Sequence, residues 1–92
     1  MVKRKDILEE AQRIVDGERE NQYGRPENNF SLIAKLWSSY LGVLISPEDV
    51  AVMMILLKSA RIKSGNSKSD NWIDICGYAA CGGEIDSMEN DI

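Results

Sequence analysis

The chain has 92 residues, of which 43% are hydrophobic and 28% are charged, and its formal net charge at pH 7 is −4. This length fits one small domain with its own core. No stretch reaches the roughly 18 apolar residues that span a membrane, and the charged start MVKRKDILEE lacks the apolar segment of a signal peptide. We therefore predict a cytoplasmic protein with no membrane partner.

The negative charge is concentrated at the C-terminal end of the chain. Residues 84–92, EIDSMENDI, contain four acids and no base, whereas the remaining 11 acids and all 11 bases lie in residues 1–83. A body without net charge does not present the basic face that duplex DNA requires, which argues against a general DNA-binding protein. We divide the chain into one helical domain, residues 1–83, and an acidic tail, residues 84–92.

The two cysteines do not form a redox or metal motif. Cys76 and Cys81 are five residues apart, and the chain contains no histidine. A CxxC pair or a zinc site needs a different cysteine spacing or further ligands. We predict that both thiols are buried and pack against a neighbouring helix.

The first half of the chain predicts two helices. Apolar residues three or four apart indicate one buried face over residues 3–20, and a second such pattern runs from Pro26 to Leu41. Between the two helices, Gly24 permits a positive φ, and Pro26 disfavours helical geometry at the residue before it. Gly42 is the expected C-terminal stop of the second helix.

The third predicted helix, residues 47–63, has the strongest local signal in the chain. Ser46 is a good N-cap, and the Pro-Glu-Asp sequence that follows it suits the first helical turn. Residues 50–57, VAVMMILL, are all apolar, so the helix has no polar face for about two turns. Such a helix has to be covered on every side, which in a chain this short predicts a homo-oligomer.

The fourth predicted helix begins at Ser69 or Asp70 and ends near the Cys-Gly-Gly of residues 81–83, because glycine is a poor helix former. The polar residues 65–69 form the loop before it. The pattern indicates neither strands nor repeats. The expected fold is an all-α single domain of four helices that assembles as a homo-oligomeric bundle.

Two groups of residues suit the recognition of a nucleotide. Tyr23, beside the glycine turn, can stack on a base, and Arg25 and Asn29 are near enough in sequence to reach phosphate or sugar. Lys58 and Arg61, about one turn apart at the end of the apolar run, suit phosphate binding. Each group also has an ordinary structural interpretation, as an interhelix loop or as the basic end of a helix.

Asp74 and Tyr78 lie four residues apart on one face of the fourth helix, with Asp70 one turn before them. Apolar neighbours surround Asp74, and a buried carboxylate needs a partner, for which Lys58 or Arg61 is the obvious choice. The two alternatives are a ligand pocket in which Asp74 and Tyr78 take part and a structural ion-pair network.

A metal-dependent enzyme is the competing hypothesis. Carboxylates spaced along a helix can bind Mg²⁺ through oxygen, and the metal ligands would be Asp49, Asp70 and Asp74. Because there is no histidine, hydrolysis would use metal-bound water. The binding hypothesis requires no cofactor.

Three segments in this order, YGRPENNF, ISPEDVAVMMILLKSARI and DNWIDICGYAA, resemble a small phage- and prophage-encoded domain family of unknown function over roughly residues 7–84. The chain is also similar to a nucleotide-modification-associated phage family with a tyrosine–glycine turn, a KxxR helix and a later aspartate-containing helix. The residues that match these patterns are Tyr23, Gly24, Asn29, Asp49, Lys58, Arg61, Asp74, Gly77 and Tyr78. The resemblance implies a phage context and a link to nucleotides.

A more distant similarity is to the all-α nucleoside triphosphate pyrophosphohydrolases of the MazG-like and dimeric dUTPase types. Those enzymes hold Mg²⁺ through an ExxE pair on one helix and an ExxD pair on the next. This chain departs from that pattern, because Glu48 and Asp49 are adjacent and Asp70 and Asp74 have DxxxD spacing.

These observations favour a helical homo-oligomer that binds a nucleotide or a nucleotide-derived signalling molecule and, in a phage setting, sequesters it from host immune signalling. The expected contacts are phosphates with Arg25, Lys58 and Arg61, a base stacked on Tyr23 or Tyr78, and base or ribose with Asn29 and Asp74. The alternatives are a Mg²⁺-dependent enzyme like the pyrophosphohydrolases and an interaction protein without a small ligand. We favour binding because the candidate residues include several cations and aromatic rings, whereas the spacing of the carboxylates suits a metal poorly.

Overall fold

The computed structural model describes residues 1–65 and 68–90. Its elements are α1 (Arg4–Arg13), the π-helical turn η1 (Ile14–Glu18), α2 (Arg19–Tyr23), α3 (Pro26–Leu41), α4 (Pro47–Lys63) and α5 (Ser69–Asn90). Because α1, η1 and α2 form one continuous rod, the described residues form four helices, and they contain no strand. The all-α, four-helix prediction is confirmed. No helix within the described part of the chain is both long and apolar enough to span a membrane.

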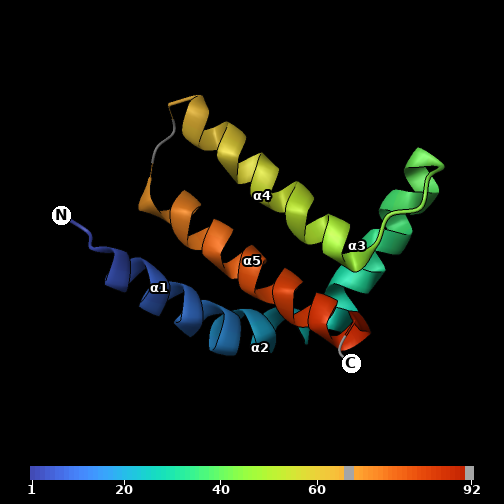
Figure 1. The fold of residues 1–92 in the computed structure, drawn as a ribbon, viewed down its shortest axis with the longest axis horizontal. Coiled ribbons are helices and arrows are strands. Elements are labelled where there is room, and N and C mark those ends of the chain that lie inside the picture. The colour runs from blue at the N-terminus through green and yellow to red at the C-terminus, as the bar shows by residue number, and fades with distance from the viewer. Residues whose placement is uncertain (66–67, 91–92) are drawn as a thin grey trace.

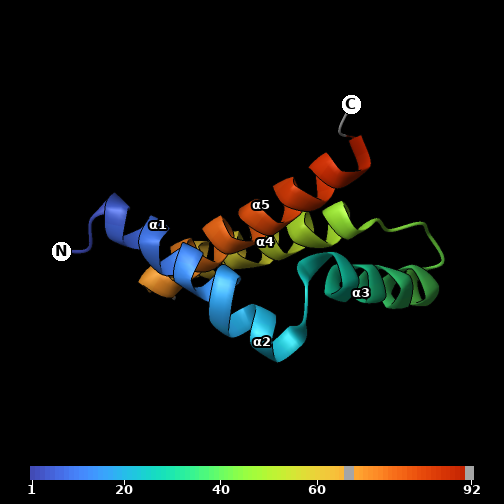
Figure 2. The ribbon, with the colours of Figure 1, turned by 90° about the horizontal axis from the view of Figure 1, so that it is seen from below.

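The last helix, α5, lies at the centre of the molecule. The antiparallel helix α4 runs along one side of α5, and the α1–α2 rod runs along the other (Figure 1). The remaining helix, α3, crosses beneath the start of α4 at a steep angle and extends beyond it (Figure 2). The other three helices therefore all contact α5.

The core lies where α3 crosses the α4–α5 pair. Its most completely buried side chains are Val50 of α4 and Phe30 of α3, at 0% and 1% exposure. The buried members of this cluster are Phe30, Ala34, Val50, Ala51, Cys81 and Ile85. They share small or branched side chains that fit between closely approaching helices, with the Phe30 ring filling the centre.

The ends of α3 and α4 follow the predicted capping chemistry. Ser46 and Asp49 form a capping box, in which the Asp49 N–H donates to Ser46 Oγ at 3.0 Å and the Ser46 N–H donates to Asp49 Oδ2 at 2.9 Å. Gly42 ends α3 in the left-handed region with φ 71°. These predictions, made from local sequence, are confirmed.

Two predicted helix boundaries are wrong. The first helix does not end at residue 20 but continues to Tyr23, after the π-helical turn. The last helix does not stop near Gly82 but continues to Asn90, and Ile85 is 2% exposed in the core. Much of the expected acidic tail is thus helical, while residues 91 and 92 lie outside the described residues.

The single chain leaves α4 partly uncovered. Of the eight apolar residues in its run, only Val50 and Ala51 are fully buried. By contrast, Val52 is 53% exposed and Leu56 is 61% exposed. The thiols also differ from expectation, because Cys81 is buried whereas Cys76 is only half-buried; both are free.

Candidate ligand-binding site

The most unusual polar feature of the molecule is Arg19, the first residue of α2. Its guanidinium carbon lies 5.1 Å from the ring centre of Tyr78, 5.4 Å from that of Tyr23 and 5.8 Å from that of Phe30. Each ring presents electron density to a cation at this range. Among the described residues, no carboxylate forms an ion pair with Arg19. Arg19 is therefore a half-buried positive charge held by aromatic rings and not by an acid.

The π-helical turn η1 is what brings Arg19 to this position. The Arg19 N–H donates to the carbonyl oxygen of Ile14, five residues earlier, as is typical of a π-helix. One extra residue in a turn rotates everything that follows by roughly 100° about the helix axis. Arg19 and Tyr23 consequently face α3 and α5, where the other two rings lie.

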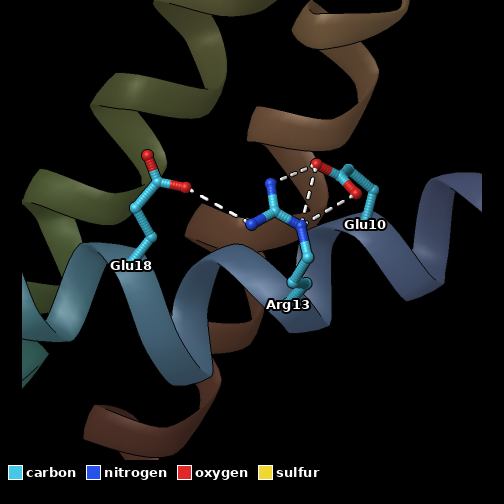
Figure 3. Close-up of polar contacts among 3 residues, drawn as sticks. All are labelled: Glu10, Arg13 and Glu18. Carbon is cyan, nitrogen blue, oxygen red and sulfur yellow. Dashed lines mark hydrogen bonds and ion pairs between the residues drawn. The ribbon is translucent and has the colours of Figure 1, made fainter.

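An ion-pair cluster on the solvent side spans the same turn (Figure 3). Arg13 donates to Glu10 through Nη2 at 2.6 Å and to Glu18 through Nη1 at 3.4 Å. The second pair joins residues five apart, a spacing that a π turn brings together. The hydrogen bond from Arg13 lowers the pKa of Glu10, and the same contact raises the pKa of Arg13. Arg13 and Glu18 are mostly exposed and Glu10 is partly exposed, so the cluster supports the turn only modestly.

Lys58 of α4 pairs with Asp74 of α5, with Nζ 2.9 Å from Oδ2. The Lys58 side chain is only 14% exposed, whereas that of Asp74 is 36% exposed. This ion pair is one of the two roles expected for Asp74 from the sequence. It leaves Lys58 neutralised by a partner from its neighbouring helix.

Arg19 lies between two hollows of the surface. A very small one, of about 20 Å³, connects Arg19 with Asp74 and Tyr78 of α5. A larger one, of about 250 Å³, lies on the outer side and is lined by Arg13, Ile14, Glu18, Arg19, Gln22 and Tyr23. Arg19 thus lines both hollows, and the exposed ring of Tyr23 lines the larger one with it.

Four of the seven residues predicted for ligand binding lie around Arg19. Tyr23 and Tyr78 contact it directly, Asp74 shares the small hollow with it, and Lys58 pairs with Asp74. Gly77 belongs to the same wall, because a Cβ there would lie 3.2 Å from Cγ1 of Val15.

The other three predicted residues lie apart from this group. Arg25 pairs with Glu27 at 2.9 Å and lines a separate hollow of about 180 Å³ whose other charged residues are Asp16, Glu20, Glu27 and Glu84. Asn29 lies in the first turn of α3 and is half-buried. Arg61 is exposed one turn beyond Lys58 and has no acidic partner among the described residues.

The carboxylates considered for Mg²⁺ are not gathered into one group. Asp49 is engaged in the capping box of α4, Asp70 is exposed at the start of α5, and Asp74 pairs with Lys58. Within the described part of the chain, no three acids or cysteines are placed to share a metal ion.

Sequence reasoning missed Arg19. It lies in the polar stretch GERENQ, where a charged residue is ordinarily solvated. The available signal was the four-residue spacing from Arg19 to Tyr23, which places an arginine and a ring on one helix face. Nothing local shows that a π turn directs this face inward.

The fold and site define a small all-α domain with an arginine–aromatic centre between its first and last helices. The chain belongs to the family described as Domain of unknown function (DUF6378), which matches residues 6–86. The expected membership of a domain family of unknown function is confirmed.

The chain is similar to the Gene 55 proteins of two mycobacteriophages. It is 52% identical over 75 residues to that of Mycobacterium phage D29, covering 82% of this chain and 50% of the phage protein. It is 45% identical over 84 residues to that of Mycobacterium phage L5, covering 90% and 52%. The chain therefore spans about half the length of these relatives. Its similarity to them confirms the expected phage connection. No solved structure matches the chain.

Proposed function

We propose that this domain binds a nucleotide or a nucleotide-derived signalling molecule at the arginine–aromatic centre. The observation that carries the proposal is the position of Arg19: a guanidinium held against three rings, with no carboxylate partner among the described residues. Unpaired, partly buried arginine is suited to phosphate, because its planar fork donates two parallel hydrogen bonds. The surrounding rings restrict its motion before any ligand arrives.

The outer hollow suits one nucleotide unit. Its volume of about 250 Å³ is slightly below the ~300 Å³ at which small-molecule pockets begin. Tyr23 is 54% exposed at its edge and offers a ring face on which a base can stack. In this arrangement a phosphate meets Arg19 and a base covers Tyr23.

The residues on the inner side supply the second contact group. Asp74 can accept a hydrogen bond from a ribose hydroxyl or a base amino group. If Asp74 turned from Lys58 to the ligand, Lys58 would become a second cation for phosphate. Arg61, exposed one turn further along α4, lies apart from this group, so its positive charge would act on a phosphate only at longer range. Arg25 faces an acidic hollow, so we assign it a smaller part than the sequence suggested.

The phage relatives support a role in the cytoplasm of an infected cell. There, a small homo-oligomer that holds a nucleotide signal tightly would withdraw it from host immune signalling. We propose sequestration and not turnover, because the site offers cations and rings where hydrolysis would need a group of carboxylates around Mg²⁺.

The experiment uses the purified 92-residue chain and a panel of nucleoside mono-, di- and triphosphates, cyclic mono- and dinucleotides and ADP-ribose, each with and without Mg²⁺. Binding is measured by calorimetry, and the ligand is recovered after heat denaturation and analysed by chromatography. Intact recovered ligand supports sequestration. A converted ligand supports the Mg²⁺-dependent enzyme, and a panel without any binding leaves an interaction protein.

Variants localise the site. Tyr23→Ala removes an exposed ring and Arg61→Ala an exposed cation, so both should leave the fold intact and weaken binding; Arg19→Gln should weaken it most. Arg4→Gln, an exposed arginine near the chain start, is the matched control. Unchanged affinity in Tyr23→Ala and Arg19→Gln together would contradict this location.

A further inference from the structure

The outer face of α4 is an apolar strip that the single chain leaves uncovered. Ala51 and Lys58, seven residues apart, contact α5, and residues on the opposite part of the helix have no such cover. The strip consists of Met53 at 36%, Leu56 at 61% and Leu57 at 42% exposure, with Ala60 also exposed, and Val52 at 53% exposure borders it on the side of the α4–α5 groove. Exposed apolar surface of this kind marks an interface.

The two ends of this strip carry opposite charges. Asp49 lies seven residues before Leu56 and Lys63 lies seven residues after it. Seven residues correspond to nearly two turns, so both charges lie on the same face of the helix as Leu56. Both side chains are exposed, and the helix rise separates their positions by roughly 21 Å.

We propose that a second copy of this chain covers the strip, with α4 packed antiparallel to α4 of the partner subunit about a two-fold axis at Leu56. In an isologous dimer the same patch serves both subunits, so it has to be complementary to its own reversed image. The strip meets this requirement, because reversal places each Asp49 opposite Lys63 of the partner subunit and apolar residues opposite apolar residues. The two helix dipoles are also aligned favourably.

Charge complementarity distinguishes this strip from the other exposed apolar surface. On α3, Leu32, Leu36 and Tyr40 form a row four residues apart, but no acid and base lie at equal distances from its centre. The apolar run of α4 needs cover on every side. In the dimer, the partner subunit covers the side that the single chain leaves exposed. The inference rests on the homo-oligomer part of the proposed function and not on ligand binding.

The first test is sedimentation velocity of the 92-residue chain between micromolar and millimolar concentration. We expect a dimer for the natural sequence. Leu56→Glu should raise the dimer dissociation constant by about 100-fold or more, because it places two carboxylates against each other in a desolvated seam. Leu36→Glu is the matched control, since both leucines are 61% exposed, and it should leave the dissociation constant unchanged.

The second test concerns the direction of pairing. Lys63→Glu should weaken the dimer by about 10-fold, and the further change Asp49→Asn should recover part of that loss, because it removes the like-charge pair while an asparagine oxygen can still accept the Ser46 N–H bond of the capping box. Leu56→Cys should form an intermolecular disulfide under mild oxidation, whereas Leu36→Cys should not. The disulfide assay uses a Cys76→Ser background.

A monomer at all concentrations overturns the inference, and so does a dimer that survives Leu56→Glu or dissociates equally with Leu36→Glu. A dimer that survives Leu56→Glu would mean that the two copies are joined by another surface. Circular dichroism verifies that each variant is folded. Nucleotide binding is measured separately on Leu56→Glu, so loss of the dimer and loss of the ligand site are distinguishable.

Discussion

Ala51 of α4 and Gly82 of α5 contact each other so closely that a Cβ on residue 82 would lie 2.8 Å from the Cβ of Ala51. This contact sets the distance and register of the two helices. Two turns further along, the same register brings Lys58 to Asp74. The glycine that locally weakens α5 is thus what allows α5 to pack against α4.

Gly82→Ala should therefore destabilise the domain despite the better helix propensity of alanine. The added methyl group has to separate two packed helices, which costs about 1–3 kcal/mol in the free energy of unfolding. Gly83→Ala is the control, because no atom lies within 4 Å of a Cβ there, and it should be neutral or stabilise by up to ~1 kcal/mol. Urea unfolding followed by circular dichroism measures both. Equal effects of the two changes would contradict the close contact.

In the Lys58–Asp74 pair, replacing the acid should cost more free energy of unfolding than replacing the base. Asp74→Asn strands the Lys58 ammonium, only 14% exposed, and should cost about 1–3 kcal/mol, below the 3–5 kcal/mol of fully buried pairs. Lys58→Met should cost less, because Asp74 is exposed enough to be hydrated. Unfolding of the two single variants and the double variant measures the coupling. A larger loss for Lys58→Met would show that the cation is the better solvated member.

The two cysteines should differ in reactivity. Burial raises the pKa of the Cys81 thiol, which therefore stays protonated at neutral pH, and its side chain is 5% exposed. Cys76 is half-buried and more accessible. With a disulfide reagent at pH 7.5, we expect one thiol to react at least ~10-fold faster than the other, in line with thiolate reactivity. Cys76→Ser should remove the fast phase; its persistence would mean that Cys81 is the accessible thiol.

The Glu10–Arg13 contact should appear in the titration of Glu10. A carboxyl whose pKa is lowered by folding stabilises the native state above its unfolded pKa, and this contribution is lost as the pH falls through the folded pKa. Arg13→Gln should raise the pKa of Glu10 towards its ordinary value. It should also lower thermal stability slightly at neutral pH, with the difference vanishing in acid. Carbon-detected NMR of the carboxyl groups measures the shift, with Arg4→Gln as the unaffected control.

Local sequence patterns determined the features that depend on neighbouring residues. Ser46 is the predicted N-cap of α4, and the structure adds that Asp49 completes a capping box with it, because the donors and acceptors lie within one turn. Apolar periodicity predicted the first two helices, since each amphipathic segment needs a buried face, and the start signals of α4 predicted the third. The sequence narrowed the partner of Asp74 to Lys58 or Arg61, and the structure shows that it is Lys58.

Only the tertiary structure decided the features that depend on distant segments. The end of α5 was misjudged because local propensity disfavours Gly82 and Gly83, while burial of Ile85 and the close approach of Ala51 outweigh that cost. The place of Arg19 depends on a π turn that costs local hydrogen-bond geometry and is maintained by rings from α3 and α5. A glycine in a helix costs about 1 kcal/mol relative to alanine, whereas burying an isoleucine side chain contributes roughly 1.5–3 kcal/mol, and packing decided both cases.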